Sequence, residues 1–257
     1  MALLIKVSKK RKEKDIDSGA AVGGVVGTLG VQALPSVGMP VANKEALGGV
    51  SPEEILEHLP KNKDRKLYKE HYSGGLLLGF VSPDKNNKHS KEEANLIFRT
   101  HNLSKNRAGY IPGFTTPDGV DSVVVPEKAN EGIIAHELAH STSRQANSKL
   151  GVAAYKLGTL GSMGGILYGA TKGSKGEDMS TPETLATIAP SLGYLPEETR
   201  ANILAGKSIY KLKGGKALMK ILPALAVSEA SYATLAASPV IANKISKAIK
   251  EHKEGQN

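Results

Sequence analysis

Two histidines, His136 and His140, flank a glutamate, Glu137, in the segment IIAHELAHS. Residues four apart lie one above the other on a helix, so both imidazoles can turn a nitrogen toward one ion. In this arrangement the glutamate does not bind the ion but takes a proton from a water bound there and later delivers it to a leaving amine. The spacing predicts two ligands of a Zn²⁺ ion and a catalytic base. The alternative is a helix that carries two histidines and no metal.

A third protein ligand must come from elsewhere in the chain. Cysteine is absent, which excludes thiolate ligands, and the only later histidine is His252, in a charged tail. The remaining candidates are the carboxylates between the histidine pair and that tail: Glu177, Asp178, Glu183, Glu197, Glu198 and Glu229. Glu198 is the best placed, because Ala201 and Ala205 share its helical face and would let two helices approach closely.

The neighbouring acid, Glu197, has different surroundings. On a helix it shares its face with Arg200, Ala201 and Leu204, which predicts a partly exposed side chain. For Glu198 the alternative explanation is a first-turn acid that the helix dipole favours after a proline. The sequence therefore favours Glu198 as the third ligand and leaves that alternative open.

The segment from Glu198 to Ala205, ETRANILA, resembles the second motif of the HtpX and CAAX-prenyl-endopeptidase type of gluzincin metallopeptidases. In that family Glu-x-x-Ala-Asp-x-x-Ala follows HExxH after a long helical excursion. Residues 106–113 (NRAGYIPG) and 121–126 (DSVVVP) are similar to the family's asparagine-proline-glycine segment and edge strand. The resemblance implies a zincin-like fold, with His136, His140 and Glu198 as zinc ligands and Glu137 as the base.

One position departs from the family pattern. Asn202 stands where the family has an aspartate that orients a ligand histidine. An asparagine oxygen can still accept a hydrogen bond from a ring N–H, so the tautomer can be kept, but it brings no negative charge. Weaker metal affinity or altered activity is the expected result. The residue that stabilises an oxyanion stays open among Tyr194, Arg200, Tyr210 and Tyr232.

The elements around the histidines are predicted to be a helix over residues 127–147 and two paired strands before it. The strands are residues 108–112 and 121–126, separated by the turn cluster TTPDG. We expect the second strand to be a sheet edge that pairs with an extended peptide substrate. Its substrate-binding residues would be Ser122, Val123, Val124 and Val125.

The other elements are predicted mainly from start signals. Ser51-Pro52-Glu53-Glu54 predicts a helix that ends by Pro60, residues 76–81 (LLLGFV) a strand or the start of a buried helix, and residues 91–99 a helix. Further helices are expected at 148–170, after Thr181, after Leu195 and from Ala217 onward. The fold class is α+β, mostly helical, with a small sheet.

Residues 1–50 are predicted to be a glycine-rich, basic N-terminal extension, and residues 51–257 the metallopeptidase domain. Small residues at helical spacing in residues 18–34 suit either close helix contacts in a membrane or a flexible linker. No run of about twenty strongly apolar residues indicates a conventional spanning helix. Between the two motifs, residues 141–195 are expected to form a soluble helical hairpin over the cleft.

The formal net charge of +9 favours contact with anionic surfaces, so an anionic membrane is an expected partner beside the peptide substrate. Three Phe and no Trp make nucleic-acid binding unexpected, because base-stacking platforms need aromatic side chains. A cytoplasmic or membrane-associated location is favoured over a cleaved secretory signal. The oligomeric state is not predicted.

The sequence supports two functional hypotheses. The first is a zinc-dependent endopeptidase that hydrolyses peptide bonds with a metal-activated water. The second is a structural or membrane-interacting protein, such as a virion or assembly component, which keeps the metallopeptidase scaffold without turnover. Asn202 and the unusual extension favour the second hypothesis.

Overall fold

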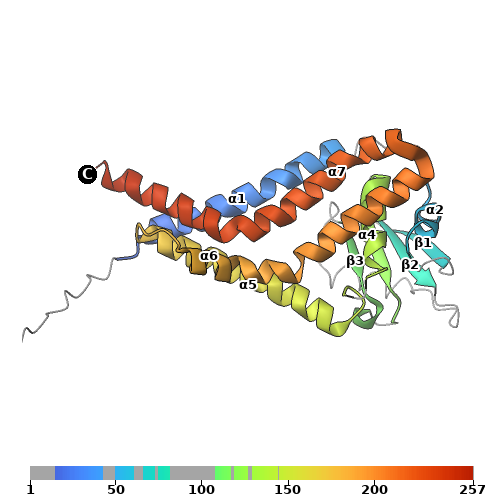
Figure 1. Ribbon diagram of the computed structural model, residues 1–257, viewed down its shortest axis with the longest axis horizontal. Coiled ribbons are helices and arrows are strands. Elements are labelled where there is room, and N and C mark those ends of the chain that lie inside the picture. Colours follow the sequence, from blue (N-terminus) through green and yellow to red (C-terminus); the bar gives the residue numbers. More distant parts are fainter. Residues whose placement is uncertain are drawn as a thin grey trace, which may run out of the picture.

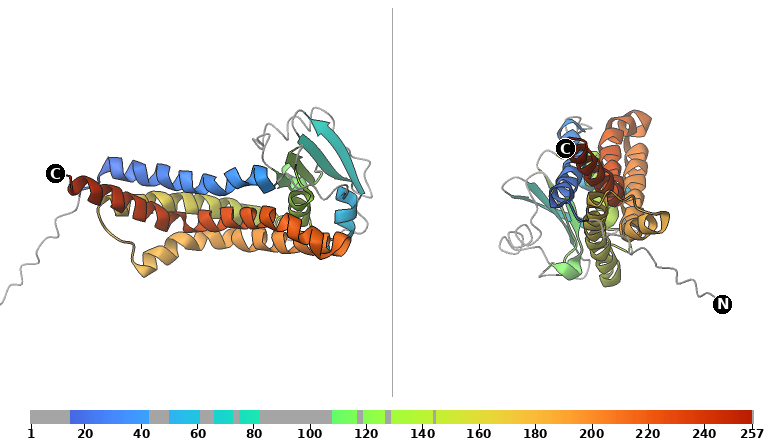
Figure 2. Two further views of the ribbon diagram at one scale, coloured as in Figure 1. Left: turned by 90° about the horizontal axis from the view of Figure 1, so that it is seen from above. Right: turned by 90° about the vertical axis from the view of Figure 1, so that its left-hand side faces the viewer.

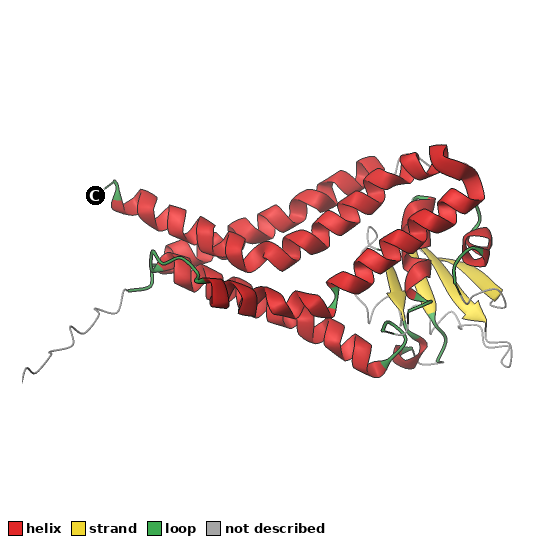
Figure 3. Cartoon of the chain, viewed as in Figure 1, coloured by secondary structure: helices red, strands yellow, loops and turns green. Residues whose placement is uncertain are grey.

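A small antiparallel sheet lies at one end of the molecule, and long helices extend from it to the other end (Figures 1 and 3). The computed structural model describes residues 15–42, 50–60, 66–72, 75–81, 108–116, 119–126, 129–143 and 145–256. The elements are α1 Ser18–Ala42, α2 Pro52–Glu57, β1 Lys66–Tyr72, β2 Gly75–Val81, β3 Gly109–Ile111, the 3-10 helix η1 Gly113–Thr115, β4 Ser122–Pro126, α4 Glu131–His140, α5 Lys149–Ser174, α6 Thr181–Ile188, the 3-10 helix η2 Ala189–Gly193 and α7 Leu195–Glu254. This arrangement confirms a mostly helical α+β fold with a small sheet.

The sheet has the strand order β1-β2-β4-β3, and all neighbouring pairs are antiparallel. The expected pairing of residues 108–112 with 121–126 is confirmed, since Tyr110 pairs with Val123. The run LLLGFV is also a strand, with Leu78 opposite Val123 on the other side of β4. The helix predicted over residues 91–99 lies outside the described residues.

The strand β4 is an interior strand, so the prediction of a substrate-binding edge at Ser122, Val123, Val124 and Val125 is wrong. β2 covers one side of β4, and β3 pairs with Ser122, Val123 and Val124 on the other. All four side chains are buried. Three consecutive valines are typical of a strand that is buried on both faces, whereas an edge strand usually alternates. Among the described strands, the edge on this side is β3.

The main hydrophobic core fills the space between the sheet and helices α2, α4 and α7. The helix α2 begins as predicted, with a capping box between Ser51 and Glu54. Its apolar face, with Ile55, joins a core that contains Leu78 and Val123 from the sheet. The same core contains Leu138 of α4 and Ala201, Ala205 and Ala217 of α7. This core fixes α4 between the sheet and the first part of α7.

The helix α4 is shorter than the predicted 127–147. It begins after its N-cap Asn130 and ends at His140. The next hydroxyls bond back to helix carbonyls: Ser141 Oγ donates to Leu138 O at 2.7 Å and Thr142 Oγ1 to Ala139 O at 2.8 Å. Such side chains compete with backbone hydrogen bonding, which explains why the helix stops directly after its second histidine.

The helix α7 is two antiparallel arms joined at Gly214. This glycine has φ 77° and ψ −173°, a conformation that residues with a Cβ rarely adopt. The first arm, residues 195–213, passes α4, and the return arm, residues 215–254, runs back along it and continues to the far end (Figure 1). The predicted helices after Leu195 and from Ala217 are these two arms. Among the described helices, α7 alone is long and apolar enough to cross a membrane. The core helix of a soluble protein can have the same length and composition.

Residues 18–42 form the single helix α1, so a flexible linker does not describe them. The helix packs along the return arm of α7 and also contacts α5 (Figure 2). Its first turn is fixed by Asp17, whose carboxylate accepts from the Ala20 N–H at 2.9 Å and pairs with Lys253 at 3.0 Å. The basic head and the segment from 43 to 49 lie outside the described residues. α1 is therefore part of a helical bundle with α5 and α7.

Candidate metal centre

Both histidines of the HExxH segment lie on the buried face of α4. The side chain of Asn130 caps the helix by accepting from the Ile133 N–H at 3.0 Å. The residues on the buried side pack against the core, and His136 and His140 are only 5% and 8% exposed. A polar ring at that depth needs a partner on each nitrogen or a metal ion.

Glu198 reaches the same place from the first turn of α7. Its side chain is buried, and the helix face it shares carries Ala201 and Ala205, both fully buried. These alanines belong to the same core as Ala135 and Ala139 of α4. The expectation that small side chains let the two helices approach closely is therefore confirmed.

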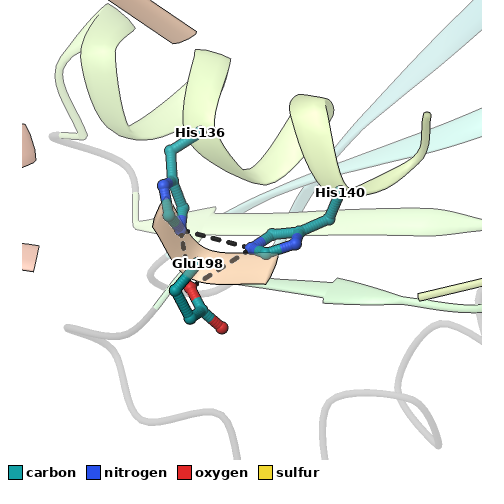
Figure 4. A group of neighbouring side chains, drawn as sticks. All are labelled: His136, His140 and Glu198. Carbon is teal, nitrogen blue, oxygen red and sulfur yellow. Dashed lines mark hydrogen bonds and ion pairs between the residues drawn. The ribbon is translucent and has the colours of Figure 1, made fainter. Parts of the chain in front are cut away.

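Three potential ligand atoms converge at this point (Figure 4). His136 Nε2 lies 3.2 Å from Glu198 Oε2, and His140 Nε2 lies 3.4 Å from the same oxygen. The two Nε2 atoms are 3.3 Å apart. Atoms bound to one zinc ion at about 2.0–2.1 Å in tetrahedral geometry are about 3.3 Å from one another. The triangle therefore has the size that a tetrahedrally coordinated ion requires, and the three side chains need no rearrangement to bind one.

The outward nitrogen of each histidine has an oxygen partner. His136 Nδ1 donates to Asn202 Oδ1 at 2.9 Å, and His140 Nδ1 donates to Glu197 Oε1 at 3.1 Å. A carboxylate can only accept here, so the proton of His140 belongs on Nδ1. In the neutral rings both Nε2 atoms consequently direct a lone pair inward, as metal ligands must.

The third corner of the triangle supports the same conclusion. Glu198 Oε2 is buried, and among the described residues the polar atoms beside it are the two Nε2 atoms, neither of which makes a geometric hydrogen bond with it. Together with the two Nε2 lone pairs it would form a cluster of three electron-rich atoms in a buried site, which is unfavourable unless a cation lies between them. This donor set, two imidazoles and one carboxylate, is one that Zn²⁺ binds in catalytic sites. The group can hold a metal ion.

Glu197 is buried, which corrects the prediction of a partly exposed acid. Its side chain is 5% exposed and accepts hydrogen bonds from His140 and from Ser143 Oγ at 2.6 Å. The guanidinium of Arg200 lies 3.4 Å from the same carboxylate and donates to Thr142 O at 3.2 Å, beyond the C-terminus of α4. Helical spacing within α7 could not reveal these contacts, because they depend on how α7 packs against α4.

Glu137 lies beside the triangle and is half-buried. Burial raises the pKa of its carboxyl, and nearby Glu198 adds to this effect. The two histidines and the backbone N–H of Tyr110, on strand β3, oppose the rise. A raised pKa makes the carboxylate a stronger proton acceptor, the property that a general base needs.

The pKa of His140 is raised to about 10 in the absence of a metal. Burial alone would lower it, but hydrogen bonds with the carboxylates of Glu197 and Glu198 outweigh that effect. Without an ion, the site therefore holds a proton among its three ligands. A metal ion would replace that proton.

Tyr155 of α5 also contacts the site, although no sequence motif indicated this residue. Its hydroxyl hydrogen-bonds to Glu198 and to Tyr232. Of the four residues considered for oxyanion stabilisation, Tyr232 is the hydrogen-bond partner of Tyr155, and Arg200 bonds to the C-terminal end of α4. Tyr194 is fully buried and Tyr210 is exposed. Only a contact between helices distant in sequence reveals Tyr155.

The comparisons with known proteins give no match: no family model, no curated protein and no solved structure matches this chain. The resemblance to HtpX-type gluzincins therefore stays a prediction that depends on the two motifs.

Proposed function

We propose that this protein is a zinc-dependent endopeptidase of gluzincin type. The observation that carries the proposal is the triangle of His136 Nε2, His140 Nε2 and Glu198 Oε2, with sides of 3.2 to 3.4 Å, next to the carboxyl of Glu137. Two histidines and a glutamate are the ligand set of a gluzincin site, and Glu137 occupies the position of its base. The zincin-like core is part of the same proposal.

Each residue has a role in this reaction. A zinc ion held by the three ligands would supply Lewis acidity for a water and for the scissile carbonyl. Glu137 takes the proton from the attacking water and donates it to the leaving amine. Asn202 and Glu197 hold the two imidazoles with Nε2 inward, so neither ring has to reorient during the cycle.

The strand β3 is the proposed binding edge for an extended peptide. It is the outer strand of the described sheet on this side, and the backbone N–H of Tyr110 hydrogen-bonds to the Glu137 carboxylate. The Tyr110 ring also stacks against His140, with centroids 6.5 Å apart. A peptide that pairs with Gly109–Ile111 would run past the base. This edge replaces the residues of β4 as the substrate-binding segment.

Substitution of Glu137 by Gln tests the function. We expect the Glu137→Gln protein to keep its zinc, because Glu137 is not a ligand, and to lose cleavage of a peptide library by about a hundredfold or more. Cleavage is followed by mass spectrometry of the products with zinc content measured in parallel. A matched control is Glu131→Gln, on the same helix but outside the triangle.

Two results would oppose the proposal. Peptide cleavage by Glu137→Gln at the wild-type rate would remove the base from the mechanism. Zinc-loaded wild-type protein that cleaves no member of the library would favour the second hypothesis, a scaffold protein without turnover.

A further inference from the structure

The bundle formed by α1, α5 and the return arm of α7 has glycines on its inside. A Cβ on Gly24 of α1 would lie 2.9 Å from the carbonyl of Ala242 and collide with Ser246. On α5, a Cβ on Gly169 or Gly173 would overlap the carbonyl oxygen of Pro239 or Asn243. The helices thus meet backbone to backbone, a packing mode that is enriched between helices in membranes.

Large apolar side chains cover the outside of the same bundle. On α1, Val22 and Val26 are more than 60% exposed. On α5, Leu157, Leu160, Met163 and Leu167 are each more than half exposed and recur at helical spacing. Exposed leucines continue on α6 and η2. Water-soluble bundles have the opposite pattern, with large apolar side chains inside and polar ones outside.

Charged residues are absent from three stretches of the bundle. None occurs in Ser18–Ala42, in residues 157–171 or in residues 230–243. They gather at the far end instead, where Asp178 pairs with Lys244 at 2.8 Å and with Lys247 at 2.5 Å. The charge-free stretches of α5 and α7 measure about 21–22 Å along the helix axis. We call the surface of these three stretches, residues 18–42, 157–171 and 230–243, the apolar belt. The belt is uncharged, and charged residues lie at its end.

Hydroxyl groups within the belt are satisfied by their own helices. Thr28 Oγ1 donates to Gly24 O at 2.7 Å, Ser162 Oγ to Gly158 O at 3.0 Å, and Ser238 Oγ to Thr234 O at 2.7 Å. Side chains bonded in this way need no water as a hydrogen-bond partner. In a hydrocarbon environment polar groups must be satisfied within the protein in this manner.

We propose that the α1, α5 and α7 bundle is embedded in a lipid bilayer, with acyl chains against the apolar belt. The belt is shorter than the ~30 Å hydrocarbon core, and the exposed Lys156 at one end of it can extend its amine toward the headgroups. The apolar side chains lie on four elements rather than on one flat patch, which favours lipid over a second copy of the chain. The metal centre lies at the sheet end of the bundle (Figure 1).

The test uses the full chain and vesicles of phosphatidylcholine with phosphatidylglycerol. Wild-type protein should float with the vesicles and stay with them in high salt. The vesicle affinity of the variant Leu160→Arg/Leu167→Arg should be about a hundredfold lower, since arginine is costly in hydrocarbon. The control Leu150→Arg lies on the same helix outside the belt, at an 81% exposed position, and should bind as wild type does. Circular dichroism and zinc content show whether each variant is folded.

Three results would overturn the lipid proposal. Wild-type protein could remain unbound and monodisperse without detergent, or salt could release it fully. A detergent-free oligomer that Leu160→Arg/Leu167→Arg dissociates would assign the belt to a second copy of the chain instead.

A second inference comes from the partner of Asn202. The amide Nδ2 of Asn202 donates to Glu229 Oε2 at 2.7 Å, while its Oδ1 accepts from His136. Thr199 Oγ1 donates to the other oxygen of Glu229 at 2.7 Å. Glu229 comes from the return arm of α7, whereas Asn202 and Thr199 lie on the first arm. The amide thus connects a histidine of the site to a carboxylate.

We infer that Glu229 is a positioning residue that acts on His136 through Asn202. The carboxylate polarises the amide, which makes Asn202 Oδ1 a stronger acceptor for the His136 Nδ1–H and so makes Nε2 a better ligand. It also fixes the amide orientation, because a flipped Asn202 would direct its oxygen at Glu229. Glu229 therefore supplies the charge that Asn202 lacks. This inference depends on the metal site of the proposed function.

Zinc affinity, measured by competition with a chromogenic chelator, tests the inference. Glu229→Gln should weaken zinc binding by roughly tenfold or more. Asn202→Asp alone would place two carboxylates together, whereas Asn202→Asp/Glu229→Gln moves the charge to position 202 and should restore wild-type affinity. Glu251→Gln, an exposed position on the same helix, is the control and should change nothing.

The double variant separates positioning from general structure. Affinity of Glu229→Gln within twofold of wild type would overturn the inference, and so would a double variant that binds no better than Glu229→Gln. Failure of the wild type itself to bind zinc would instead remove the proposed function.

Discussion

At the scale of single residues, each histidine of the site is connected to a carboxylate. His140 reaches Glu197 directly, and His136 reaches Glu229 through Asn202. The sequence pattern predicted both histidines, and the elimination of other acids favoured Glu198. It missed Glu197 and Glu229, because their roles depend on contacts between helices that spacing within one helix does not report.

Substitution of Glu197 should weaken metal binding. In Glu197→Gln the neutral amide can still accept from the His140 Nδ1–H but no longer makes the ring more basic, so zinc affinity should fall by roughly 10- to 100-fold. Titration against a competing chelator measures the change, with the more exposed Glu177→Gln as control. Equal affinities for the two variants would contradict the role assigned to Glu197.

Zinc binding should release a proton. The pKa of His140 is raised to about 10 in the metal-free protein, above the ordinary value of about 6.5. The ring is therefore protonated at pH values between these two pKa values. A ligand must be deprotonated to bind zinc, and the proton leaves as zinc enters. Calorimetric titration in buffers of different ionisation enthalpy detects this. An observed enthalpy that is the same in every buffer would rule the protonated state out.

At the scale of elements, the strands β3 and β4 and the principal helix starts followed from local signals, whereas the strand β1 was not predicted. The capping box at Ser51, the turn between β3 and β4 and the proline near the start of α7 are short-range features that the sequence displays. The interior position of β4 was not predictable, because strand order depends on tertiary pairing. Nor was the packing of α1, since the same glycines suit a linker and a close helix contact.

Glycine packing between α5 and α7 should contribute to stability. A methyl at Gly169 would overlap the Pro239 carbonyl, so Gly169→Ala should lower the free energy of unfolding by about 1–3 kcal/mol. Gly164→Ala on the same helix meets no atom within 4 Å and should be neutral or stabilising by up to about 1 kcal/mol. Chemical denaturation measures both in matched detergent. Equal stabilities would contradict the close backbone contact.

At the scale of the whole molecule, α7 joins the two ends of the structure. Its first arm contributes Glu198 to the metal centre, and its return arm forms the bundle with α1 and α5. The metal ligands come from α4 and α7, which pack on opposite sides of the same alanine-rich contact. Residues 18–42 and the C-terminal half thus belong to one arrangement, whereas the sequence suggested an extension followed by a domain.

The metal content of the purified protein tests the central claim most directly. The triangle of His136, His140 and Glu198 predicts one zinc ion per chain at neutral pH after dialysis, measured by inductively coupled plasma mass spectrometry. Glu198→Gln, which removes the anionic corner, should lose most of that zinc, while the exposed Glu251→Gln should retain it. Wild-type protein that holds no zinc, or a Glu198→Gln protein that holds as much as wild type, would contradict the account.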